Sequence, residues 1–165
     1  MTLEQLYNHG KGFAAAQFNA EGAISPMWIL ETIDGKHIPV VAPMEAMADK
    51  DQFAAAIQEL MQLKRAVRYV SMLEAWMATV DKDINRQELY DELAVVPVRE
   101  RPDRQEIIWV IAEDRYHKMA GYYTIIRPEN GPPRVGEYIE HHYKTEKGEV
   151  EGRFVNLLGE GPSVQ

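Results

Sequence analysis

The chain contains no cysteine among its 165 residues. This absence excludes disulfide bonds, thiolate metal ligands and a cysteine nucleophile, and it is compatible with a reducing compartment. No stretch approaches the roughly 18 consecutive apolar residues of a membrane-spanning helix. The opening "MTLEQLYNHGKGF" lacks the basic start and apolar run of a signal peptide. We therefore expect a cytoplasmic protein with no membrane contact.

Positive charge is also in short supply. Lysine and arginine number 18 against 26 aspartate and glutamate residues, which gives a net charge of −8. Nucleic-acid binding depends largely on lysine and arginine side chains that neutralise phosphates, so this balance disfavours a nucleic-acid partner. An acidic surface suits solubility, or a partner protein whose surface is basic.

The composition is that of a folded domain. Hydrophobic residues make up 45% of the chain and charged residues 27%, which excludes a mostly disordered protein. The length suits one domain, and neither an internal repeat nor a linker interrupts it. We predict a single α+β domain over residues 1–158, followed by a flexible tail over residues 159–165.

The first third of the chain predicts a helix and a hairpin. Thr2 followed by Gln5 resembles a capping box that opens a helix. Gly10 and Gly12 weaken the centre of that helix, which favours an interruption or a restart near Phe13. Two apolar segments then flank an Asp-Gly pair at positions 34–35, which is typical of a tight hairpin. The returning segment contains a proline at position 39, and this indicates an edge strand.

The next segment raises an ambiguity. Asp49 or Asp51 caps a helix over residues 50–66, whose apolar residues recur at spacings of three and four. Residues 67–80 fit either a continuation of this helix or a strand, because neither glycine nor proline separates the two. We favour a strand from about Val67, since one helix of 30 residues is long for a domain of this size.

The second half of the chain is rich in predicted strands. A short helix over residues 81–93 and a charged loop precede them, and short turns separate them. The predicted strands cover residues 105–113, 122–128, 134–144 and 149–158. These patterns predict a mostly antiparallel sheet with a C-terminal meander and one or two helices packed on one face.

The stretch "EYIEHHYK", residues 137–144, is the densest group of candidate metal ligands. Side chains alternate across a strand, so His141 and His142 point to opposite faces and cannot share one ion. Glu140 and His142 lie on the same face, about 7 Å apart along the strand. This pair suits two ligands of a metal site, or a carboxylate that orients an imidazole.

A metal site on this strand needs a third ligand. The connection from Glu113 to His117, which includes Asp114, offers three candidates. Together with Glu140 and His142, such a group makes a metal-dependent hydrolase one hypothesis, and a divalent metal is then the cofactor. The alternative is a solvated strand face that binds no cofactor, because the spacing matches no known metal motif.

Glu74 is a candidate catalytic residue. In a strand it shares a face with Met72 and Trp76, and apolar neighbours raise the pKa of a carboxyl group toward the range of a general acid or base. The alternative is an ion pair of Glu74 with Arg68 or Arg127.

The sequence favours an interaction protein over an enzyme. It contains neither a nucleophile motif nor a phosphate-binding loop. Trp28, Trp109, Tyr122 and Tyr123 suit core positions, but a cluster of them facing outward indicates a protein interface. We therefore expect a small acidic protein that binds a basic protein surface or a second copy of itself. A regulatory inhibitor, or one of the phage type, belongs to this class.

Overall fold

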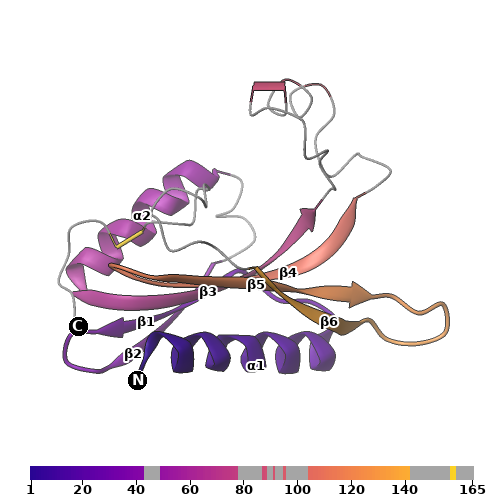
Figure 1. Ribbon diagram of the computed structural model, residues 1–165, viewed down its shortest axis with the longest axis horizontal. Coiled ribbons are helices and arrows are strands. Elements are labelled where there is room, and N and C mark those ends of the chain that lie inside the picture. Colours follow the sequence, from indigo (N-terminus) through magenta and orange to yellow (C-terminus); the bar gives the residue numbers. More distant parts are fainter. Residues whose placement is uncertain are drawn as a thin grey trace.

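The computed structural model describes residues 1–42, 49–77, 87–88, 91, 95, 104–141 and 157–158. Two helices and six strands follow one another along these residues (Figure 1). They are α1 (Leu3–Glu21), β1 (Met27–Thr32), β2 (His37–Val41), α2 (Lys50–Leu63), β3 (Ala66–Met77), β4 (Gln105–Asp114), β5 (Lys118–Ile126) and β6 (Arg134–His141). The strands form one sheet in the order β2-β1-β3-β4-β5-β6, and each neighbouring pair is antiparallel. The predicted α+β class with an antiparallel sheet is confirmed.

The predicted capping box opens α1. The Gln5 N–H donates to the Thr2 hydroxyl at 3.1 Å, and the Thr2 N–H donates to the Gln5 side chain at 2.8 Å. The helix then runs unbroken through Gly10 and Gly12 to Glu21, so the predicted interruption does not occur. Packing of the helix on the sheet outweighs the weak helix propensity of glycine.

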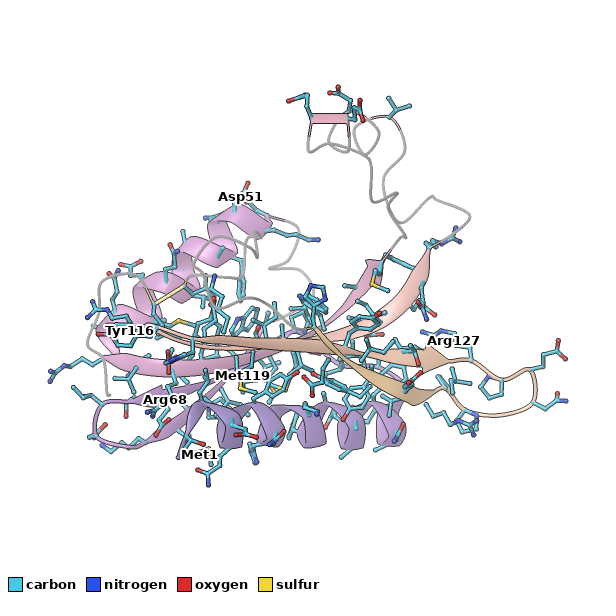
Figure 2. The ribbon with its side chains drawn as sticks, viewed as in Figure 1. Met1, Asp51, Arg68, Tyr116, Met119 and Arg127 are labelled. Atoms are coloured by element: carbon cyan, nitrogen blue, oxygen red, sulfur yellow. The ribbon has the colours of Figure 1, made fainter. Side chains whose placement is uncertain are left out.

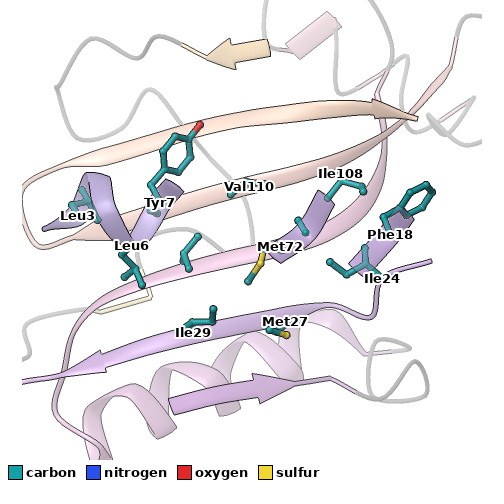
Figure 3. Close-up of a cluster of buried hydrophobic side chains, with 13 residues drawn as sticks. Leu3, Leu6, Tyr7, Phe18, Ile24, Met27, Ile29, Met72, Ile108 and Val110 are labelled. Carbon is teal, nitrogen blue, oxygen red and sulfur yellow. The ribbon is translucent and has the colours of Figure 1, made fainter. Parts of the chain in front are cut away.

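The two helices cover opposite faces of the sheet (Figure 1). Alternate residues of β1 show this: Met27 and Ile29 pack beneath α1, whereas Trp28 and Leu30 pack beneath α2. The cluster beneath α1 draws on α1, β1, β3 and β4 (Figure 3). The cluster beneath α2 also includes Leu157 and Leu158. The sequence predicted one or two helices on one face of the sheet. The structure has two helices on the sheet, and α2 gives it a second core on the face opposite α1.

A residue in the left-handed backbone region separates α2 from β3. Arg65 has a φ of 55°, between the end of α2 and the start of β3, and its carbonyl accepts the Ile33 N–H at 3.0 Å. Glycine usually occupies such a position at the end of a helix. Because this chain has arginine there, the sequence does not show where the helix ends. The interpretation as a strand from about Val67 is confirmed, since β3 begins at Ala66.

Replacing Arg65 with glycine is expected to raise the free energy of unfolding by about 0.5–1 kcal/mol, because relief of the left-handed strain exceeds the added entropy of the unfolded chain. Urea denaturation measures this change. Lys64→Gly is the matched control, since Lys64 has a φ of −84°. That variant is expected to lose stability by up to about 1 kcal/mol, and an equal loss in Arg65→Gly would contradict the strain.

The remaining predicted elements are an edge strand, a short helix, a last strand and a tail. Among the described strands, β2 lies at the edge of the sheet, as the proline at position 39 indicated, and pairs with β1 alone. The predicted helix over residues 81–93 lies almost entirely outside the described residues. So do the predicted tail and the predicted strand over residues 149–158, apart from Leu157 and Leu158.

Candidate functional site

Glu140, the candidate metal ligand of β6, points toward α1. It shares that face with Tyr138, as strand alternation predicted. Its carboxylate accepts a hydrogen bond from the Tyr7 hydroxyl at 2.9 Å and an ion-paired hydrogen bond from Lys11 Nζ at 3.0 Å. Its predicted co-ligand His142 lies outside the described residues. In the described structure Glu140 therefore ties β6 to α1.

The surroundings of Glu140 form a polar network of four residues: Tyr7, Lys11, Tyr138 and Glu140. The two tyrosine hydroxyls are hydrogen-bonded to each other, and Lys11 Nζ lies 4.0 Å from the centroid of the Tyr138 ring. Burial raises the pKa of both tyrosine hydroxyls, and the nearby charge of Glu140 raises both further. Both hydroxyls therefore stay protonated at neutral pH and remain available as donors.

Asp114 and His117 come together in the turn between β4 and β5. Asp114 Oδ1 accepts the N–H groups of Tyr116 and His117, both at 2.7 Å, and lies 3.3 Å from His117 Nδ1. Val110 is the β4 residue level with Glu140, and Asp114 lies four residues beyond it, about 13 Å along the strand. The turn does not bring Asp114 to Glu140.

Glu113, the remaining candidate for the third ligand, faces the other way. It is buried and lies 3.2 Å from Lys118 Nζ, on the side of the sheet opposite Asp114. Among the described residues, no three histidine or acidic side chains are grouped so that they could hold a metal ion. Because His142 is outside these residues, the metal site stays a prediction.

Glu74 lies partly buried near the end of β3. Its Oε2 accepts the Ile24 N–H at 3.2 Å, which fastens the segment after α1 to the sheet. Arg127, one of its predicted partners, makes a bidentate ion pair with Glu106 instead. This pair raises the pKa of Arg127 most, and the charge of Glu74 adds a smaller increase. Arg68, the other predicted partner, bonds to a different carboxylate.

A cleft of about 830 Å³ opens at the end of the sheet where α1 begins. Figure 2 shows Met1, Arg68 and Tyr116 at this end of the molecule, opposite Arg127. Its walls come from the first turn of α1, the ends of β1 and β3, and the turn after β4. The lining residues are Met1, Thr2, Leu3, Gln5, Glu31, Thr32, Ile33, Gly35, Val67, Arg68, Asp114, Tyr116 and His117.

Three charged residues lie side by side across three strands in the cleft. Arg68 of β3 pairs in register with Glu31 of β1 and with Asp114 of β4, so their side chains share one face. Arg68 Nη1 donates to Glu31 Oε2 at 2.9 Å, and the side chains retain only 13% and 7% exposure. The amino group of Met1 lies 3.7 Å from Glu31 Oε1. We call Glu31, Arg68 and Asp114 the charged row.

Aromatic rings gather on the other face of the sheet. Trp109 of β4 contacts Tyr122 of β5 and His141 of β6, with ring centroids 5.8 Å and 6.0 Å apart. Trp109 and Tyr122 are half-buried and His141 is exposed. The strand residues packed around α2 come from β1, β2 and β3, so these three rings lie outside that cluster. We call them the aromatic face.

The other two aromatic candidates, Trp28 and Tyr123, contact the helices that pack on the sheet. Trp28 is fully buried beneath α2. Tyr123 points toward α1, where its hydroxyl donates to the Lys11 carbonyl at 3.1 Å. Of the four aromatic residues considered from the sequence, Trp109 and Tyr122 thus remain as candidates for an interface.

The fold and these sites define a class of protein: an α+β domain with a six-stranded antiparallel sheet covered by a helix on each face. No family model, curated protein or solved structure matches the chain. In the described part of the chain, no helix is long and apolar enough to cross a membrane.

Proposed function

We propose that this protein is a non-catalytic interaction protein that binds a basic protein surface through its aromatic face. The observation that carries the proposal is the contact of Trp109 with Tyr122 and His141 on three adjacent strands. Tryptophan and tyrosine are the residues most enriched in the binding centres of protein interfaces. On a sheet these rings form a rigid platform, because each side chain stands on a paired strand.

The charge of the chain indicates the kind of partner. A net charge of −8 attracts a basic protein surface and repels an acidic one. Glu137 is exposed on β6, four residues before His141, and therefore on the same face of the strand. An acidic surface with an aromatic anchor suits an inhibitor that occupies the basic groove of a nucleic-acid-binding protein. We therefore favour a regulatory inhibitor of this type.

The hydrolase hypothesis has less support. Glu140 hydrogen-bonds to Tyr7 and Lys11, and Asp114 closes its own turn. These contacts give both carboxylates a structural role that needs no metal. The hypothesis of an interaction protein does not require any residue to give up such a contact.

Trp109→Ala is expected to weaken binding to the partner at least about tenfold, because it removes the central ring of the platform. The partner is captured from the native host with the intact protein, identified and purified, and its affinity is then measured by calorimetry at two salt concentrations. The proposal expects a basic partner whose affinity falls as salt rises. Circular dichroism establishes that the variant is folded.

Trp76→Ala is the matched control. Trp76 is also an exposed tryptophan, but strand alternation places it on the face of the sheet that α1 covers, opposite the aromatic face. This variant is expected to bind like the wild type. An acidic partner, or equal binding by Trp109→Ala and the wild type, would overturn the proposal.

A further inference from the structure

The cleft at the start of α1 has no part in the proposed function. It lies at one end of the sheet on the α1 side, whereas the aromatic face is on the opposite side. Its volume of about 830 Å³ falls within the range of small-molecule sites in proteins. Such sites combine an apolar wall with a few convergent polar groups, and this cleft has both.

Stability alone does not account for the charged row. Burying a guanidinium and a carboxylate costs several kcal/mol per ion, and an apolar pair of similar size is often at least as stable. Glu31 is nonetheless buried, and Arg68 largely so, at the wall of the cleft. Within the described structure, Arg68 Nε has no hydrogen-bond partner. A buried ion pair beside a cavity is better explained by a ligand that the cavity receives.

The cleft presents both signs of charge. Arg68 is positive, and the first turn of α1 adds a partial positive charge from its N–H groups. Asp114 is negative and lies next to Arg68 in register. Leu3, Ile33 and Val67 supply the apolar part of the lining.

We propose that this cleft binds a zwitterionic small molecule, namely an α-amino acid with an apolar side chain. Its carboxylate lies toward Arg68 and the first turn of α1, and its ammonium group lies toward Asp114. Its side chain packs along Leu3, Ile33 and Val67. A zwitterion fits better than a simple anion or cation because each charged end meets the opposite charge in the cleft.

Calorimetric titration of the full chain with L-leucine tests this proposal. Two analogues separate the charged ends: 4-methylpentanoate lacks the ammonium group, and leucinamide lacks the carboxylate. L-leucine is expected to bind, and each analogue is expected to bind at least about tenfold more weakly, since one end loses its partner. Absence of binding by L-leucine up to about 10 mM, a concentration above the usual range for specific small ligands, overturns the proposal.

Asp114→Asn separates binding from folding. The amide oxygen of asparagine still accepts the N–H groups of Tyr116 and His117, so the turn is retained. The variant is expected to bind L-leucine about tenfold more weakly and to lose the preference for L-leucine over 4-methylpentanoate. Glu59→Gln, which changes an exposed carboxylate on α2, is the matched control and is expected to bind normally. Unchanged binding by Asp114→Asn contradicts the assigned role of Asp114.

Discussion

Arg68→Met is expected to lower the free energy of unfolding by about 3–5 kcal/mol, because it leaves a buried carboxylate without its partner. Glu31 is 5% exposed, and its Oε2 accepts the Arg68 guanidinium at 2.9 Å. The Met1 amino group forms an ion pair with the other oxygen at 3.7 Å, but this is too distant for a hydrogen bond, so it offsets only part of the loss of Arg68. Urea denaturation at neutral pH, followed by circular dichroism, measures the loss.

Two further variants identify the cause of that loss. Glu31→Leu combined with Arg68→Met removes both charges, and its stability is expected within about 1 kcal/mol of the wild type or above it. Arg127→Met breaks the exposed ion pair with Glu106 and is expected to lose at most about 1 kcal/mol. If Arg68→Met loses no more than Arg127→Met, the buried pair does not carry the predicted energy.

The double variant also connects stability with the cleft. It removes the guanidinium that the proposed amino-acid carboxylate approaches, while the buried carboxylate that would destabilise the fold is absent. A folded double variant that no longer binds L-leucine therefore separates ligand binding from the integrity of the protein.

Local signals in the sequence predicted most of the elements. The capping box at Thr2 and Gln5, the apolar stripe of α2 and the proline at position 39 each act within a few residues, so their structural meaning can be read directly. The prediction of a break at Gly10 was wrong because the role of this glycine depends on its contact with Val70 of β3, 60 residues away in the chain.

The candidate sites were harder to predict because they depend on register. Strand alternation correctly placed Glu140 with Tyr138, yet their contacts with Tyr7 cross more than 130 positions of sequence. Arg68 was considered as a partner of Glu74, but pairing of β1 with β3 sets it opposite Glu31. The turn at Asp114 did carry a local signal, since aspartate often accepts backbone N–H groups two or three residues ahead.

Gly10→Ala is expected to lower the free energy of unfolding by about 1–2 kcal/mol, because overpacking costs more than the gain in helix propensity. Gly10 is buried where α1 crosses β3, and an added Cβ would lie 2.5 Å from Val70 Cγ2. The Val70 side chain is short, branched and fully buried, so it cannot turn away. Thermal unfolding measures the change, and at this chain length 1 kcal/mol corresponds to about 2–4 °C.

Gly12→Ala provides the matched control within the same helix. An added Cβ at Gly12 meets no atom within 4 Å, so this variant is expected to gain about 0.5–1 kcal/mol from helix propensity alone. Val70→Ala removes the methyl groups that the new Cβ would contact. In that background Gly10→Ala is expected to become stabilising, because the Cβ then fills space that valine left. A loss of equal size in both backgrounds would show that the contact with Val70 is not the reason for glycine at position 10.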